Sequence, residues 1–402
     1  MIAAAVLAAT LSLGDVESAA VAHAPTVNEA RARVSEMQSL LDAARGTGLP
    51  HAIVNYAQVP QGGSAGGTVL QRLTTVGGQV VLGDVATHDP LVAQAAANVR
   101  SATAAELGVE RVERVKAVGL FVDAIRTREV SQLRSEILAG AQGDRYAAKI
   151  RFQSGGVPRL DVVRAEVEVA RAQAALATAR ADEINARRNL ATEMAAKSDA
   201  FALPSLSQIG VAGATLPPSP EAAIASALVT RPEIRGAQAD VAAEEGAVRT
   251  SHRGVLPALT VQAGYTTGVD SGINVSGPSA NVTLDLPVSR AASDRSRAES
   301  ARLSQARARL AGATQTVTTE VANAFESLKA QREASAASAS ARAEAAAEIR
   351  AAATGYREGA SSSLDLADAR RTYAAAVVDD VAARADLDRS ILTFALAAGE
   401  QP

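Results

Sequence analysis

One stretch of this sequence occurs twice. The first copy reads FQSGGVPRLDVVRAEVEV from Phe152, and the second reads YREGASSSLDLADARRTY from Tyr356. The two copies align without a gap at an offset of 204 positions, so that Asp161 matches Asp365. Each copy has glycine and serine between two long helix-forming runs, which is typical of a tight turn between antiparallel helices. The sequence therefore predicts two hairpins of long helices.

The repeat extends upstream of these turns. Pro25 matches Pro232 and Pro50 matches Pro257, both at an offset of 207. A duplication of this length constrains the architecture before any single motif is considered. We expect a possible signal remnant at 1–10, a first structural repeat at 11–199, a linker at 200–219 and a second repeat at 220–399.

The composition suits long helices better than a thick globular core. Only 2% of the residues are aromatic and there is no Trp, which favours helices packed closely through small side chains. The net charge of −3 gives no case for nucleic acid. The absence of Cys excludes disulfides and Cys-ligated metals, and the four His are scattered without the spacing of metal ligands. We expect no cofactor and no metal site.

The first ten residues, MIAAAVLAAT, are apolar and small, like the later part of a secretory signal. They lack the basic region that precedes such a segment. We interpret them as a truncated or misassigned signal start. The alternative is a frayed beginning of the first helix.

The pattern of apolar and polar residues predicts a mainly α fold with a small β part. Strands are expected at about 51–60, 68–83, 256–267 and 278–288, with TTGVDSGIN as the loop between the last two. Asp89 followed by Pro90 predicts the start of a long helix that runs to Phe152, because Pro is favoured at the first helical position. The arrangement helix–strand–strand–long helix–helix then repeats in the second half.

The strand at 259–266 alternates strictly. One face carries Leu259, Val261, Ala263 and Tyr265, and the other carries Thr260, Gln262, Gly264 and Thr266. This pattern fits a lipid-facing exterior and a watery lumen, although a half-buried soluble sheet gives the same alternation. Four strands cannot close around water, and an open strand edge is not tolerated in lipid. Lipid exposure would therefore require oligomerisation.

The duplicated order of elements resembles the TolC-type outer-membrane efflux protein family. The phrases RPEIRGAQADVAAEEGAVRTSHRGVLPALTVQAGY and YREGASSSLDLADARRTY resemble it as well, and the resemblance runs from about Leu11 to Gly399. It implies a homotrimer in the outer membrane of a Gram-negative bacterium, extending into the periplasm. Each chain would give four strands to a shared twelve-stranded barrel and its helices to a periplasmic tunnel. Such a channel would be a passive exit duct of tripartite efflux or type I secretion, joined by a periplasmic adaptor (membrane fusion) protein to an inner-membrane pump.

The resemblance also implies a gate at the periplasmic tip. It places the pore constriction on Asp365 and Asp368 and gives Asp161 and Tyr356 a part in gate-closing contacts. Carboxylates at i and i+3 share a helix face, so a trimer would carry two stacked rings that favour cations. The structural alternative for Asp161 and Asp365 is the helix dipole, which favours a carboxylate early in a helix by roughly 0.3–1 kcal/mol.

One position departs from the family pattern. The basic partner of the gate falls on Ser361, which cannot form a charged link to Asp161, although Arg357 or Arg159 could substitute. The resemblance further implies that the adaptor docks on the two tips, at Ser154, Gly155, Gly156, Glu358, Gly359 and Ala360.

Other functions remain as alternatives at this point. A soluble periplasmic coiled-coil scaffold or adaptor would share the long helices, but it would not need two duplicated pairs of strands. An enzyme is disfavoured, because the sequence has no Ser/His/Asp grouping and no phosphate-binding glycine loop. Within the channel class, heavy-metal efflux is an alternative to drug or protein export, and the few His and three Met give it no positive support.

Overall fold

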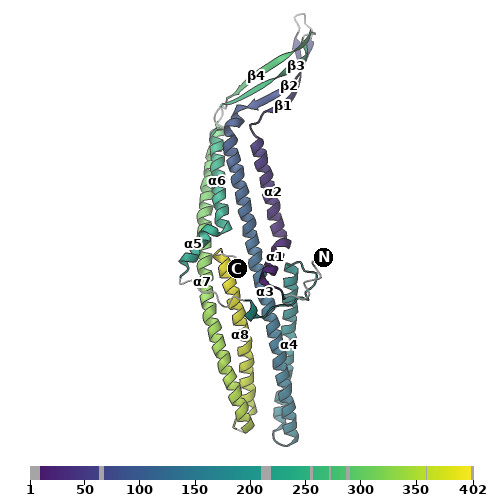
Figure 1. Cartoon of the computed structure of the whole chain (residues 1–402), viewed down its shortest axis with the longest axis vertical. Helices are drawn as coiled ribbons and strands as arrows, with labels where there is room; N and C mark the ends of the chain where they lie inside the picture. Colours follow the sequence, from purple (N-terminus) through teal and green to yellow (C-terminus); the bar gives the residue numbers. More distant parts are fainter. Residues whose placement is uncertain are drawn as a thin grey trace. The chain divides into compact units, whose positions relative to one another are not determined.

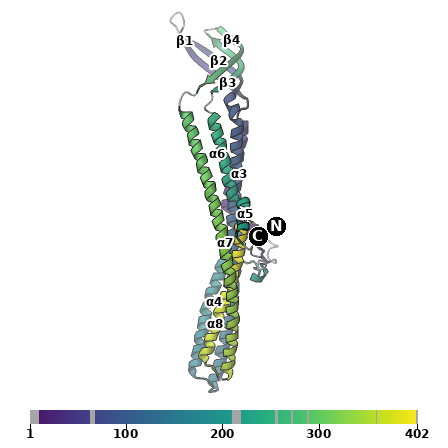
Figure 2. The same cartoon turned by 90° about the vertical axis from the view of Figure 1, so that its left-hand side faces the viewer.

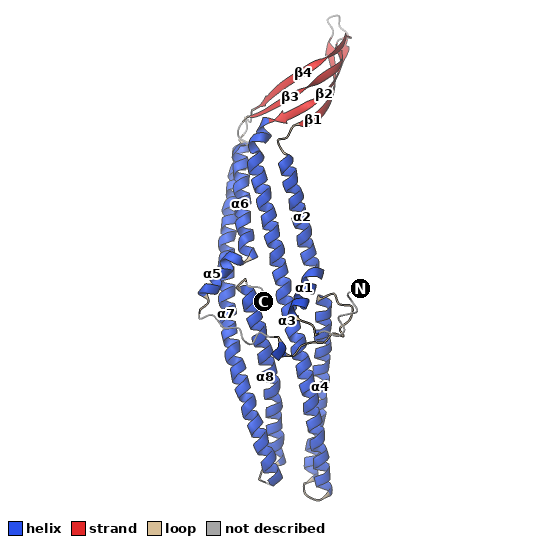
Figure 3. Ribbon diagram, in the orientation of Figure 1, coloured by secondary structure: helices blue, strands red, loops and turns tan. Residues whose placement is uncertain are grey.

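A computed structural model describes residues 10–62, 68–209, 219–253, 257–270, 273–286, 290–358 and 360–399. Residues 1–9 of the expected signal remnant at 1–10, part of the linker, and the tip residue Gly359 lie outside the described residues. The predicted class, mainly α with a small β part, is confirmed (Figures 1 and 3). The elements in chain order are α1 Leu13–His23, α2 Pro25–Gly46, β1 His51–Gly62, β2 Thr68–Val81, α3 Leu82–Gln153, α4 Arg159–Glu193, η1 Leu206–Gln208, α5 Glu221–Thr230, α6 Pro232–Arg253, β3 Ala258–Asp270, β4 Ile273–Asp285, α7 Ala291–Glu358 and α8 Ser363–Ala397.

The chain forms two compact units, and each draws on both sequence repeats. The helical unit comprises Met1–Asn28, Gly108–Arg231 and Gln315–Pro402. The sheet unit comprises Glu29–Leu107 and Pro232–Thr314. None of the helices in the described part of the chain has an apolar stretch long enough to cross a membrane.

The sheet has four antiparallel strands in the order β1-β2-β3-β4, which lie side by side in Figure 2. The pair β2–β3 joins the first repeat to the second. Strands β1 and β4 each have one neighbour within the chain, so each presents one edge. Pro60 and Pro278 lie in these edge strands, where a missing backbone N–H is tolerated best.

The two faces of the sheet differ as the alternation of residues predicts. On one face Val76 lies opposite Tyr265, and their exposed fractions are 56% and 54%. On the other face three hydroxyl groups form a row across the strands. Thr75 Oγ1 lies 2.7 Å from Thr266 Oγ1, and Thr266 Oγ1 donates to Ser279 Oγ at 2.8 Å. The apolar face of the sheet is therefore open, and the opposite face is lined with small polar groups.

Two expectations about element boundaries are wrong. The expected loop TTGVDSGIN is mostly paired strand, because β3 continues to Asp270 and β4 begins at Ile273. Backbone pairing overrides the turn preference of these Gly, Asp, Ser and Asn residues. Pro90 does not begin a helix but lies inside α3. The two turns before Pro90 are anchored to the end of α2 by His88, whose Nδ1 lies 2.7 Å from the Thr47 carbonyl oxygen.

The core of the helical unit gathers around α3. Phe121, Val122 and Ile125 are almost fully buried there, in one cluster with residues of α1, α4 and α8. Burial of this apolar surface stabilises the unit by roughly 25 cal/mol per Å². The segment 201–209 covers the cluster and is held by charged side chains. Arg128 donates to the Pro204 carbonyl at 2.8 Å, and Glu129 accepts from the Leu206 backbone N–H at 2.8 Å.

A buried carboxyl of α8 lies in this region. Asp388 is 7% exposed. Burial, reinforced by the negative charge of Glu129, raises the pKa of Asp388 to about 6, and Arg384 opposes the shift. A raised carboxyl pKa means that ionisation is less favourable in the folded chain than in the unfolded chain.

We predict that Asp388→Asn stabilises the chain at neutral pH. The free-energy cost of ionising Asp388 in the folded chain is fully present above about pH 6, and it is absent below the ordinary carboxyl pKa of about 4. The variant should therefore gain roughly 1–3 kcal/mol at pH 7.5 and almost nothing near pH 4. Urea denaturation in detergent at both pH values measures this. Asp379→Asn, an exposed carboxylate of the same helix, is the control, and an equal effect of Asp388→Asn at both pH values would contradict the prediction.

We also predict that Gly264→Val disrupts the sheet. A Cβ at Gly264 would lie 2.6 Å from the Val76 carbonyl oxygen, whereas one at Gly277 of the neighbouring strand meets nothing within 4 Å. Gly264→Val should lower the free energy of unfolding by about 1–3 kcal/mol or more, and Gly277→Val should have a much smaller effect. Chemical denaturation of both variants in detergent tests this, and equal losses would show that the close approach is not decisive.

Candidate functional site

The turn between α3 and α4 is closed by a Schellman motif. Gly155 N–H donates to the Phe152 carbonyl at 3.0 Å, and Gly156 N–H donates to the Arg151 carbonyl at 2.8 Å. Gly155 has φ of 77°, a left-handed conformation that strains any residue with a side chain. The glycines predicted at this tip are therefore required by the turn itself.

The turn between α7 and α8 has the equivalent hydrogen bond. Ala360 N–H donates to the Gly355 carbonyl at 2.8 Å, which corresponds to the bond from Gly156 to Arg151 at the repeat offset. Ser361 lies against Gly355, where a Cβ would come within 2.3 Å of Ser361 Oγ. Ser361 is thus part of the close packing of the turn.

Asp365 caps the first turn of α8. Ser362 donates to Asp365 Oδ2 through its backbone N–H and its hydroxyl, each at 2.8 Å, and Asp365 N–H donates back to Ser362 Oγ at 3.2 Å. The hydrogen bond from the Ser362 backbone N–H, and to a smaller extent the one from the Ser362 hydroxyl, keeps the pKa of Asp365 below its usual range. Such a capping box satisfies free N–H groups at a helix start. Asp365 therefore stabilises the start of α8, which is the structural alternative to a role in the pore.

Asp161 connects the two hairpins. Its side chain is only 11% exposed, and Ser363 Oγ donates to Asp161 Oδ1 at 2.7 Å. Arg164 completes the group, at 3.2 Å from Ser363 Oγ and 3.7 Å from Asp161. The partner of Asp161 is thus a hydroxyl together with Arg164. Arg357, one substitute considered from the sequence, donates instead to the Ala353 carbonyl of its own helix.

Two further contacts join the hairpins. The guanidinium of Arg151, near the end of α3, lies 5.0 Å above the ring of Tyr356 in α7, a cation–π contact. Further from the tips, Arg370 of α8 forms an ion pair with Asp144 of α3. Tyr356 is therefore held between the hairpins, as Asp161 is. Arg151, Ser363 and Arg370 were not identified from the sequence, because their partners lie about 200 residues away or in another helix.

Asp368 differs from the other predicted gate residues. Its side chain is 70% exposed and forms an ion pair with Arg371 of the same helix at 3.5 Å. Asp365 and Asp368 lie one turn apart on α8, near the tip. Beside them both tips expose a leucine, and Leu160 and Leu364 are equivalent in the repeat, with exposed fractions of 54% and 52%.

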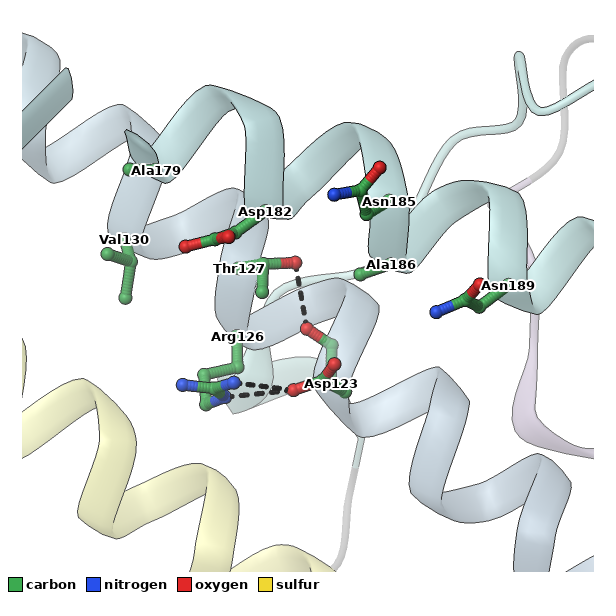
Figure 4. Close-up of a pocket in the computed structure, with 9 residues that line it drawn as sticks. All are labelled: Asp123, Arg126, Thr127, Val130, Ala179, Asp182, Asn185, Ala186 and Asn189. Carbon is green, nitrogen blue, oxygen red and sulfur yellow. Dashed lines mark hydrogen bonds and ion pairs between the residues drawn. The ribbon is translucent and has the colours of Figure 1, made fainter. Parts of the chain in front are cut away.

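A polar groove of about 250 Å³ lies between α3 and α4, away from the tips (Figure 4). Asp123 receives two hydrogen bonds from Arg126 there, at 2.6 and 3.1 Å, so its charge is balanced. Within the described ranges, no three His, Cys, Asp or Glu residues come together in a way that could hold a metal ion. The groove offers neither a nucleophile with a base nor a metal site.

The sequence and the fold are similar to those of known proteins. Residues 223–400 match the family model described as outer membrane efflux protein. The outer membrane efflux protein BepC of Brucella suis is 27% identical over 278 residues, which are 68% of this chain and 60% of that protein. The match therefore spans less than two thirds of the curated relative's length.

Solved structures show the same fold along nearly the whole chain. The structure of CusC superposes with a TM-score of 0.83 at 15% identity and covers 97% of this chain and 92% of that chain. The outer-membrane channel OprN gives a TM-score of 0.79 at 20% identity, covering 97% and 90%. VceC from Vibrio cholerae gives 0.78 at 17% identity, covering 96% of both chains.

These similarities define the fold, a small sheet joined to long helical hairpins. The resemblance inferred from the sequence is confirmed: residues 223–400 match the outer membrane efflux protein family, and solved outer-membrane channels share the fold of nearly the whole chain. The comparisons also bear out the predicted location, the outer membrane of a Gram-negative bacterium, with the chain extending into the periplasm.

We predict that Asp161 and Ser363 are energetically coupled. Loss of a hydrogen bond to a charged group that is mostly buried should cost about 1–3 kcal/mol. A double-mutant cycle with Asp161→Asn and Ser363→Ala, measured by chemical denaturation, should give a coupling energy of about 1 kcal/mol. Strictly additive effects of the two substitutions would show that the contact does not join the hairpins.

Proposed function

We propose that this chain forms, as a homotrimer, the outer-membrane exit duct of a tripartite efflux or type I secretion system. The observation that carries the proposal is the sheet, which has an open apolar face and two edges with a neighbour on one side only. Unpaired backbone groups are too costly in lipid, so these edges need partners. Pairing β4 of one copy with β1 of the next satisfies both edges, and three copies share a twelve-stranded barrel.

The opposite face of the sheet supports a passive conduit rather than an enzyme. Its row of Thr75, Thr266 and Ser279 presents hydroxyl groups. Small uncharged polar groups suit a water-filled lumen. The alternative of a soluble scaffold would leave Val54, Val76 and Tyr265 in water, at a cost of roughly 25 cal/mol per Å².

The duct needs partners at its periplasmic end. We assign the docking of the periplasmic adaptor, and through it the inner-membrane pump, to the two tips. The tight glycine turn at Ser154, Gly155 and Gly156 and the exposed Leu160 and Leu364 beside the turns support this assignment. Glu358, Gly359 and Ala360 are assigned the same role at the second tip.

The gate is proposed at the same tips. Asp368 is the better candidate for a ring of carboxylates, because its side chain is mostly exposed. Asp365 stands one turn earlier and would form a second ring, with one of its oxygens used in the cap. Asp161 and Tyr356 hold the two hairpins of each chain together and so favour the closed arrangement.

We propose an efflux or secretion duct without assigning the chemical class of its cargo. Heavy-metal efflux would gain support from a cluster of metal ligands, and the described part of the chain contains none. We therefore do not favour heavy metals over drugs or secreted proteins.

We predict that the detergent-extracted protein forms discrete, cation-selective channels in a planar bilayer. Millimolar divalent cations should block the wild type and should block Asp365→Ala/Asp368→Ala much less, because the carboxylate rings that bind them are gone. The measured quantity is single-channel conductance with and without the cation.

Asp379→Ala is the matched control, since it removes an exposed carboxylate of the same helix away from the tip. Block that persists unchanged in the double variant would retain the duct and overturn the gate. Well-folded protein that never inserts would overturn the duct and favour the soluble scaffold.

A further inference from the structure

A patch of arginines lies where the helices of the second repeat meet the sheet. It comprises three exposed residues, Arg249 near the end of α6, Arg290 directly before α7 and Arg295 in the second turn of α7, and we call it the junction patch. The two helix ends are joined by Ser296, whose Oγ lies 3.3 Å from His252 Nδ1. Both ends lie beside the sheet in Figures 1 and 2. Two helices that are held together therefore carry the patch.

The positive charge at this junction exceeds the negative charge around it. Residues 249–253 and 290–302 contain six Arg and only two acidic residues, Asp294 and Glu299. Each of these two acids already pairs with an arginine that follows three positions later. Within the described ranges, the three arginines of the junction patch form no ion pair. Their charge is therefore available to an anionic partner.

The equivalent junction of the first repeat lacks this charge. At the offset of 207 that relates the repeats upstream of the strands, Arg249 corresponds to Asp42. At the offset of 204 that applies after the strands, Arg295 corresponds to Leu91. The same order of helices and strands therefore forms without arginine at these positions. The fold does not require the patch, so its charge calls for another explanation.

The local electrostatics of the patch favour an anion. Arg290 and Arg295 lie at the start of α7, where the positive end of the helix dipole disfavours further positive charge. An anion bound between the arginines removes this repulsion. Guanidinium groups also match phosphate oxygens in geometry, because two parallel N–H groups can donate to one phosphate. A phosphate group is therefore the partner that suits the patch best.

The neighbouring sheet indicates which phosphate compound this is. Leu284 and Leu286, at the end of β4, are 56% and 55% exposed, and Leu284 lies opposite Leu259 on the open apolar face. Arg290 follows Leu286 by only four positions. A phospholipid has both complementary parts, acyl chains for the leucines and a phosphate for the arginines. A free phosphate ion would gain nothing from the apolar surface.

We propose that the junction patch binds the phosphate groups of anionic phospholipids at the membrane surface. The inference rests on the proposed duct, because a sheet that lies in lipid brings phospholipids beside the patch. It adds the recognition of one class of lipid by the second repeat. The bound phosphates also fix the level of the junction between sheet and helices relative to the membrane surface.

Lipid retention by the full-length chain tests this inference. Protein extracted in a neutral detergent is mixed with equal amounts of phosphatidylglycerol and phosphatidylcholine that have the same acyl chains, and native mass spectrometry counts the lipids that stay bound. The wild type should retain phosphatidylglycerol in preference by on the order of ten-fold, because arginines near a membrane surface attract anionic lipid. High salt should reduce this preference. Equal retention of the two lipids would overturn the inference.

The variant Arg290→Gln/Arg295→Gln should lower the preference to about two-fold or less, because two of the three guanidinium groups are gone. Arg309→Gln/Arg350→Gln is the matched control, since it removes two exposed arginines of the same helix that lie further from the sheet. The control should keep the wild-type preference. A preference that survives in the first variant, or that falls equally in the control, would show that the patch is not the binding surface.

Inorganic phosphate distinguishes a lipid from a free anion. Millimolar phosphate, compared with chloride at the same ionic strength, should leave the retention of phosphatidylglycerol nearly unchanged, because phosphate has no acyl chains. Complete displacement of the lipid by phosphate would identify a site for the free ion and would overturn the assignment to phospholipids.

Channel recordings separate this inference from the proposed duct. In a bilayer of phosphatidylcholine alone, the wild type and Arg290→Gln/Arg295→Gln should form channels of the same conductance, because the patch lies far from the proposed gate. Channels from a wild type that shows no lipid preference would retain the duct and overturn the patch. Folded protein that forms no channel and shows no lipid preference would overturn both.

Discussion

The need to satisfy every backbone hydrogen bond in lipid is the constraint on which the rest of this structure depends. The edges of β1 and β4 have no partner within the described sheet, and its apolar face is open. We propose that further copies of the same chain pair with these edges.

Duplication has kept the backbone of the two tips and changed the surroundings of the helices. The two turns share the same closing hydrogen bond, at Gly156 and at Ala360. At equivalent positions of the return helices, Ile184 of α4 is exposed and Asp388 of α8 is buried. Equivalent helices of the two repeats therefore pack differently within the chain.

The sequence predicts the features that depend on local chemistry. The glycines of the tip and the alternation of Leu259 to Thr266 follow from turn preference and strand period. The start of α3 and the end of β3 were wrong, because strand pairing and the anchor at His88 override local preference there. The contact from Ser363 to Asp161 spans about 200 residues, and a single sequence carries no signal that joins them. The roles proposed for Asp365 and Asp368 stay predictions.

The chemistry of the tip shows how the two hairpins of the chain are held together. Where a charged partner would give an ion pair, Ser361 is packed in the turn, and Asp161 is held by the Ser363 hydroxyl with Arg164 nearby. Salt weakens an exposed ion pair, since the Debye length is about 8 Å at physiological ionic strength. It has little effect on a mostly buried bond between a carboxylate and a hydroxyl. Asp365 is fixed by its cap and cannot move without unwinding the first turn of α8. We therefore propose the exposed Asp368 as the carboxylate that responds to ions.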